Sequence, residues 1–185
     1  AKSQLTMAGF RGRQAEVAFL FFRAVAPIGL FLFVLIYMFL FFGPEVSVVM
    51  KIGAGIAGAY LGLKAPEILL KNKISKRQLS MRRAFPDSMD LILICVESGM
   101  SIESAFRKVS GEIGVQSIEM AEEFALTTAE LSYLPDRRQA YENLGVRTGV
   151  DGLKQVSTVL IQAEKYGTPL GQALRVVAQE GRDAR

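Results

Sequence analysis

One uncharged run constrains the fold of this chain more than any other feature of its sequence. Residues 24–42 read AVAPIGLFLFVLIYMFLFF and contain no charged side chain. At about 1.5 Å per residue, a helix of this length crosses a hydrocarbon core of roughly 30 Å. A core helix of a soluble protein normally has a polar face, and no charged residue interrupts this run. The run therefore predicts a membrane-spanning helix.

A second and less apolar run, residues 46–63, follows after three residues, Gly43, Pro44 and Glu45. In lipid no hydrophobic force drives helices together, so small residues four apart are a main way for two backbones to approach closely. We therefore predict a second membrane helix here and a transmembrane hairpin over residues 17–63. Lys51 lies near one end of this helix, where its ammonium can reach the headgroups. The small residues predicted to pack the hairpin are Ala54, Gly55, Gly58, Ala59 and Gly62.

The distribution of basic residues predicts the orientation of this hairpin. Four basic residues precede the first run, seven lie in residues 64–83, and the turn between the two runs has none. By the positive-inside rule, both flanks face the cytoplasm and the protein is multi-pass. Residues 64–83 contain one acid, so we expect a basic connector helix at the surface of anionic lipid. Residues 1–16 are predicted to form a short interfacial segment.

The charge balance reverses in the remaining part, residues 84–185. This part contains 10 basic and 15 acidic residues, a net charge of −5. An acidic unit is not attracted to phosphate backbones, so no nucleic-acid partner is expected, and a basic protein surface is a more natural partner. Alternatively, the acids of residues 119–130 form a solvated helix face that binds no partner. These acids are Glu119, Glu122, Glu123 and Glu130.

The chain has one cysteine and no histidine, which removes much of the usual chemistry of sites. A disulfide within the chain is impossible, and a zinc site of the usual Cys/His kind is excluded. A Cys–His mechanism lacks its base. Cys95 lies in the apolar run LILICV and is predicted to be a small core residue. We expect no metal and no cofactor.

Residues 84–185 are predicted to form six short helices, because apolar residues recur at helical spacing and no stretch alternates as a strand does. Pro86 and Asp87 are expected to start the first helix, which ends at Gly99. Ser101 is a predicted N-cap for the second. The later helices are expected near 116–134, from 135 to 145–149, over 151–166, and from Thr168 and Pro169 onward. The apolar face predicted for the second helix is Ile102, Ala105, Phe106, Val109 and Ile113.

Two stretches of this part, ESGMSIESAFRKV at 97–109 and KYGTPLGQALRVV at 165–177, repeat each other at an offset of 68 residues. Gly99 aligns with Gly167, where a left-handed conformation closes a helix. Further aligned pairs are Ile102 with Leu170, Ala105 with Ala173, Phe106 with Leu174 and Val109 with Val177. The repeat predicts two similar helical hairpins that bury their apolar faces against each other. The predicted fold class is all-α, with a two-helix transmembrane hairpin and a cytoplasmic six-helix bundle.

The stretches FPDSMDLILICVESGMSIESAF and LIQAEKYGTPLGQALRVVAQE resemble the cytoplasmic domain of the type II secretion system F family. This family supplies inner-membrane platform proteins of type II secretion systems, type IV pili and archaeal flagella. The chain is most similar to the tight-adherence (Tad, Flp-pilus) branch and to its TadC type. The resemblance implies a non-catalytic scaffold of the bacterial inner membrane, between a hexameric cytoplasmic ATPase and the pilins. It also implies pairing with a sister platform protein of the TadB type or with itself, and further membrane segments beyond residue 185.

Motif position and exposed charge suggest which residues face partners. Besides the four central acids, we expect Glu97, Arg137, Arg138 and Glu164 to contact partner proteins. The alternative is a membrane-associated enzyme, for which Glu97 and Glu164 near two helix ends are the candidate carboxylates. The two readings differ in whether a Glu-to-Gln change at these positions removes a measurable turnover.

Overall fold

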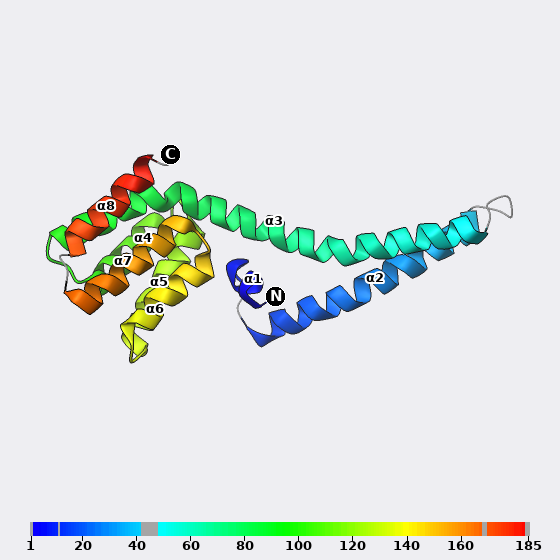
Figure 1. Ribbon diagram of the computed structural model, residues 1–185, viewed down its shortest axis with the longest axis horizontal. Coiled ribbons are helices and arrows are strands. Elements are labelled where there is room, and N and C mark those ends of the chain that lie inside the picture. Colours follow the sequence, from blue (N-terminus) through cyan, green and yellow to red (C-terminus); the bar gives the residue numbers. More distant parts are fainter. Residues whose placement is uncertain (1, 11, 42–47, 168–169, 184–185) are drawn as a thin grey trace. The chain divides into compact units, whose positions relative to one another are not determined.

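The computed structural model describes residues 2–10, 12–41, 48–167 and 170–183, and within these ranges the chain forms eight α-helices and no strand. The all-α prediction is confirmed. The chain divides into two compact units, Ala1–Ile74 and Ser75–Arg185. The helices are α1 (Lys2–Met7), α2 (Arg13–Phe41), α3 (Val48–Glu97), α4 (Ile102–Ile113), α5 (Ile118–Tyr133), α6 (Arg137–Thr148), α7 (Asp151–Tyr166) and α8 (Leu170–Asp183) (Figure 1).

In the N-terminal unit, α2 contains an apolar segment, Val17–Leu40, of 24 residues with a mean hydropathy of 2.4. Among the described residues this is the one helix long and apolar enough to cross a membrane. Its large side chains, such as Phe33 and Leu40, are mostly exposed. Contiguous exposed apolar surface of this size is rare on a soluble monomer and normal on a helix surrounded by lipid.

The start of α3 lies against α2 through small residues. A Cβ atom added to Gly58 would lie 2.9 Å from Cγ2 of Val34, and one added to Gly62 would lie 2.8 Å from Cα of Pro27. Gly55 meets α2 in the same way, so a larger residue at these positions would separate the two helices. The turn predicted at residues 43–45 lies outside the described residues. Lys51 is buried with its ammonium 4.7 Å from the centroid of the Phe39 ring, a cation–π contact. Its reach to the headgroups stays a prediction.

The prediction that a new helix starts at Pro86 and Asp87 is wrong, because α3 runs unbroken for 50 residues and contains both. A proline inside a helix removes one hydrogen bond and costs about 3 kcal/mol. Around this proline, however, apolar side chains are buried on both sides, and each contributes about 1.5–3 kcal/mol. These buried residues are Met81, Ala84, Phe85, Met89 and Ile92. Packing therefore decides the continuity of the helix, and the local sequence signal does not.

In the C-terminal unit, helices adjacent in sequence pack on each other from α4 to α8, around one core that also includes the end of α3. Phe106 and Phe124 meet at this core with ring centroids 5.1 Å apart. The apolar face predicted for the helix after Ser101 is confirmed, because all five of its residues are buried in α4. Helix α8 is held to α3 by ion pairs from Arg175 to Glu97 and from Arg182 to Asp90.

In their described residues, the two repeated stretches share a glycine with positive φ that is followed by a helix. Gly99 and Gly167 both have positive φ angles, 89° and 64°, which L side chains rarely adopt. Helices α4 and α8 each begin three residues after their glycine, and Ser101 caps α4 by accepting a hydrogen bond from the Ser104 N–H at 3.2 Å. Thr168 and Pro169, expected to start the last helix, lie outside the described residues. Pro135 precedes α6, whose cap is Asp136.

Candidate functional site

A buried cluster of charged side chains joins α3, α5 and α6, and we call it the charge cluster. Its centre is Glu123 of α5, whose side chain is only 1% exposed. Arg77 of α3 donates hydrogen bonds to Glu123 over 3.1 Å and to Glu122 over 2.9 Å. Arg147 of α6 donates to Glu123 over 2.9 Å and to Glu130 over 2.6 Å. The two arginines therefore hold three helices together through one carboxylate.

The carboxylates of the charge cluster stabilise the charged form of Arg77. Burial by itself lowers the pKa of Arg77, but the hydrogen bonds and charges of Glu122 and Glu123 outweigh this effect and the pKa is raised. An unpaired buried carboxylate is very costly, whereas a carboxylate that accepts bonds from two guanidinium groups is compensated. The neighbouring Gln78 also joins α3 to α6, because its amide donates to the carbonyl of Thr148 over 3.1 Å.

Of the four acids predicted on α5, Glu123 is buried, Glu119 and Glu130 are half-buried, and Glu122 is exposed. We expected Glu123 to be exposed to a partner, and this is wrong, because it is buried beneath Arg77 and Arg147. Glu119 accepts a hydrogen bond from Ser80 of α3 over 2.7 Å, which is the main reason why its pKa is lowered. Helical spacing alone does not show that another helix supplies arginines to this face.

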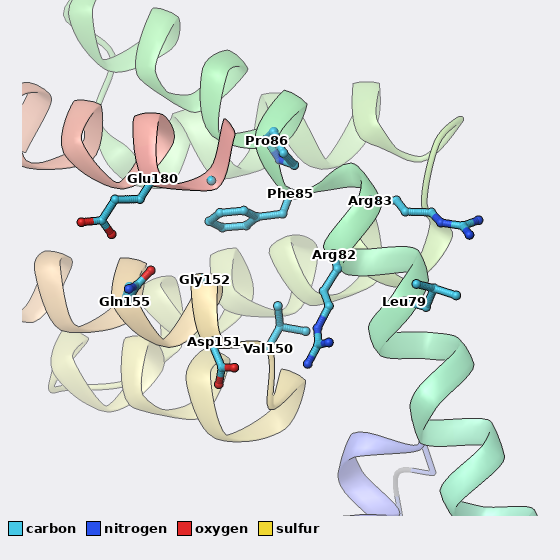
Figure 2. Close-up of a pocket in the computed structure, with 11 residues that line it drawn as sticks. Leu79, Arg82, Arg83, Phe85, Pro86, Val150, Asp151, Gly152, Gln155 and Glu180 are labelled. Carbon is cyan, nitrogen blue, oxygen red and sulfur yellow. The ribbon is translucent and has the colours of Figure 1, made fainter. Parts of the chain in front are cut away.

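A cleft of about 890 Å³ lies between α3, α7 and α8 in the same unit (Figure 2). Its charged groups come from all three helices: Arg82 and Arg83 from α3, Asp151 from α7 and Glu180 from α8. Figure 2 shows the Arg82 side chain extending toward the start of α7, where Asp151 lies. The cleft thus offers both signs of charge, which suits a peptide or protein surface better than a single anion.

The Phe85 side chain forms the apolar base of this cleft, and two glycines make room for it. A Cβ atom added to Gly152 of α7 would lie 2.7 Å from the Phe85 ring, and one added to Gly181 of α8 would lie 2.8 Å from it. Such contacts are shorter than van der Waals distance, so any larger residue must displace the ring. Phe85 therefore requires both glycines, and it fixes the approach of α7 and α8 to α3.

A second surface lies where α5 ends, α6 begins and α7 ends, and we call it the tyrosine end. Tyr133 and Tyr166 are 89% and 68% exposed there. An ion pair joins the start of α6 to the end of α7, where Nε of Arg137 lies 3.5 Å from Oε1 of Glu164. The pKa of Arg137 is raised, first through a hydrogen bond with Tyr141, whose own pKa is raised by burial.

The predicted partner residues thus fall into three separate places. Arg137 and Glu164 come together at the tyrosine end, with the exposed Arg138 next in sequence. Glu97 instead pairs with Arg175 of α8. The four acids of α5 belong to the charge cluster or, for Glu119, to a hydrogen bond with α3.

The two carboxylates of the enzyme alternative lie in separate ion pairs. Glu97 and Glu164 are each engaged with an arginine at the surface, and neither lines the cleft. Among the described residues there is no group of three His, Cys, Asp or Glu side chains placed to hold a metal ion. Cys95 is buried and free, as expected of a core residue.

Sequence reasoning missed the most important partners in these sites. Arg77 was counted only among the basic residues of segment 64–83, and Arg147 was not singled out, because nothing beside either arginine in the sequence marks it as the partner of a buried acid. Phe85 was read only as part of a motif, and its need for Gly152 and Gly181 involves residues 67 and 96 positions away. The exposed tyrosines carried no local signal other than their place beside helix ends.

Fold and sites together define an α-helical protein whose described residues include one candidate membrane-spanning helix and whose C-terminal unit has ion pairs between its helices. Residues 89–185 match the family described as Type II secretion system (T2SS), protein F, and the chain belongs to this family. Members of the family are membrane-associated structural platform proteins. The domain indicates a platform role in secretion or pilus assembly. No curated protein and no solved structure gave a match to the chain.

Proposed function

We propose that this protein is an inner-membrane platform of a tight-adherence type IV pilus or secretion machine, of the TadC type. In this role it couples a hexameric cytoplasmic ATPase to the assembly of pilins. The observation that carries the proposal is α3, one helix that belongs to both units of the chain. Arg77 and Glu123 fasten this helix to α5, so a displacement of the C-terminal unit is passed to the helix that continues into the N-terminal unit.

The membrane arrangement of the proposal is a hairpin of α2 and the start of α3, with both flanks in the cytoplasm. Support comes from the close approach of Gly58 and Gly62 to α2, which suits packing in lipid. The apolar side chains at the start of α3, such as Val49 and Ile56, are also exposed. The basic segment 64–83 then lies at the anionic surface of the inner leaflet.

The C-terminal unit is proposed as a cytoplasmic bundle of two similar hairpins that binds the ATPase at the tyrosine end. Exposed tyrosine and arginine side chains are the residue types that most often dominate the energy of protein interfaces. Tyr133 at the end of α5, Arg138 at the start of α6 and Tyr166 at the end of α7 supply them. The cleft beside Phe85, with both signs of charge, is proposed to receive the sister platform protein of the TadB type or a second copy of this chain.

Inserting two glycines between Lys71 and Asn72 tests the role of α3. Each glycine costs a helix about 1 kcal/mol and adds a flexible joint, so we expect piliation to be abolished while the amount of protein stays normal. The same insertion after Gly43, in the predicted turn of the hairpin, is the matched control and should leave piliation unchanged. Normal piliation with the α3 insertion would contradict the proposed coupling.

Extraction of the full-length tagged protein from its native cells in mild detergent, with mass spectrometry of what accompanies it, tests the partners. We expect a secretion ATPase and a sister platform protein to copurify with the unaltered chain. A Tyr133→Ala/Tyr166→Ala double variant should lose the ATPase, whereas Val115→Ala, which alters a side chain 96% exposed elsewhere in the unit, should retain it. Equal recovery from both variants would show that the tyrosine end does not bind the ATPase.

A further inference from the structure

The N-terminal unit contains an apolar groove between α1, α2 and α3 that none of the sites above uses. Its volume is about 550 Å³, within the range of sites that hold small molecules. The residues that enclose it most directly are Leu5, Phe10, Phe19, Phe22, Leu69 and Leu70. Nearly all of the surface is apolar, so the groove suits a hydrocarbon chain and offers little to a polar ligand.

The groove exists because small side chains occupy the facing positions of two helices. Ala18 and Ala26 of α2 and Ala65 of α3 contribute only methyl groups to its wall. Leu5 and Leu70 are buried beside it and form a small core with Ala8, which holds α1 against the two long helices. The groove is therefore part of the packed structure of this unit and not a gap at a frayed end.

One charged side chain, Lys73, completes the lining. Its ammonium lies 3.8 Å from the centroid of the Phe10 ring, which holds the charge at the edge of the apolar surface. The nearby acid of α3, Glu67, is already engaged by Arg23 at 3.5 Å and by Lys64 at 3.8 Å. The sequence around Lys73 is otherwise basic, with Lys71 and Lys76 close by on the same helix.

The groove is also continuous with the helix that is long and apolar enough to span a membrane. Ala18, Phe19, Phe22 and Ala26 all belong to the segment Val17–Leu40. The basic residues of α3 lie beyond the predicted hairpin, at the level where headgroups are expected. An apolar groove that starts in this segment and ends at a lysine is complementary to a phospholipid. The acyl chains would lie in the apolar part and the phosphate at the ammonium.

We propose that this groove binds one anionic phospholipid, with an acyl chain along Phe19 and Leu69 and its phosphate at the Lys73 ammonium. The inference rests on the membrane placement proposed above and adds a defined lipid site to it. Bound lipid would fill the space between α1 and the two long helices and so fix α3 at the point where it leaves the membrane. The general attraction of basic residues to an anionic leaflet needs no groove, so an experiment can distinguish it from binding of one lipid in the groove.

Native mass spectrometry of the full-length protein in mild detergent, with an equimolar mixture of phosphatidylglycerol and phosphatidylcholine, tests the site. We expect the unaltered protein to retain one lipid and to prefer phosphatidylglycerol. Lys73→Gln should reduce that preference about fivefold, the change expected for one cation near a phosphate. Lys71→Gln removes the same charge outside the groove and should leave the preference unchanged.

Filling the groove is the second arm of this experiment. Ala65→Phe should abolish retention of both lipids, while Ala57→Phe, an exposed position of α3 outside the groove, should not. Equal effects of Lys71→Gln and Lys73→Gln, or lipid retained by Ala65→Phe, would overturn the proposal. So would a copurifying polypeptide, in place of lipid, that Ala65→Phe removes. Because these experiments measure lipid binding by the purified protein, their outcome is independent of the piliation tests.

Discussion

Arg147 of α6 donates a hydrogen bond from Nε to the carboxylate of Glu123 of α5 over 2.9 Å, and both side chains are nearly or fully withdrawn from water. A carboxylate in this position is stable only while its cationic partners remain. The pair therefore differs from the surface ion pairs elsewhere in the unit, and its loss should lower the free energy of unfolding by more than the loss of a surface pair.

Replacing Arg147 by Met should destabilise the protein by about 3–5 kcal/mol, because Glu123 and Glu130 then lose a buried partner. The measurement is the free energy of unfolding of the detergent-solubilised protein from denaturant titration. Lys154→Met is the control, since Lys154 and Asp151 form an exposed pair at 3.1 Å that should contribute less than about 1 kcal/mol. Equal losses in the two variants would contradict the assignment of a buried cluster.

Gly181→Ala should destabilise the protein by about 1–3 kcal/mol, because its Cβ would lie 2.8 Å from the Phe85 ring. In a protein that already carries Gly181→Ala, Phe85→Leu should lower the free energy of unfolding by less than it does alone, which a double-mutant cycle measures. Gly111→Ala in α4 is the control. A Cβ there meets nothing within 4 Å, so this change should stabilise the helix by about 0.5–1 kcal/mol.

The Glu119 carboxyl should show a defined dependence of stability on pH. Because the hydrogen bond from Ser80 lowers its folded-state pKa below 4.5, folding favours the ionised form. Its contribution is present above about pH 4.5 and is lost as the pH falls through the lowered pKa. Ser80→Ala should therefore raise the pKa of Glu119 and flatten this part of the profile of thermal unfolding midpoint against pH.

The control for this change is Ser110→Ala, which removes a hydroxyl that donates to the carbonyl of Arg107 over 2.8 Å and touches no carboxylate. It should leave the shape of the pH profile as it is. An identical profile for Ser80→Ala and the unaltered protein would show that the hydrogen bond does not stabilise the ionised carboxyl.

Gly167→Ala should destabilise the protein by about 1–2 kcal/mol, since φ is 64° and an L side chain is strained there. Gly99→Ala should behave alike, because φ is 89° and the position is equivalent in the repeat. Gly114→Ala is the control: this helix end has a φ of −58°, and the nearest atom to a Cβ would lie at 3.7 Å. Thermal unfolding of the three variants separates backbone strain from the loss of a glycine as such.

Much of the local structure could be predicted from the sequence. The apolar face of α4, the end of α7 at Gly167 and the matching starts of α4 and α8 all follow from periodicity and turn chemistry, which involve residues a few positions apart. The apolar segment of α2 follows from composition alone. The sites were predicted less completely, because the proposed partner residues lie in three separate places and the pairing of the α5 acids with Arg77 and Arg147 was not predicted.

By itself, then, the sequence determined most of the helix boundaries from α4 to α7 and the presence of one candidate membrane-spanning segment, since these depend on neighbours along the chain. The tertiary structure decided that α3 continues through Pro86, that Glu123 is buried beneath Arg77 and Arg147, and that Phe85 needs Gly181. Each of these outcomes depends on a residue supplied by another helix or on side chains packed from several helices at once. Periodicity shows that a side chain lies on a given face of a helix, whereas only the packed structure shows what covers that face.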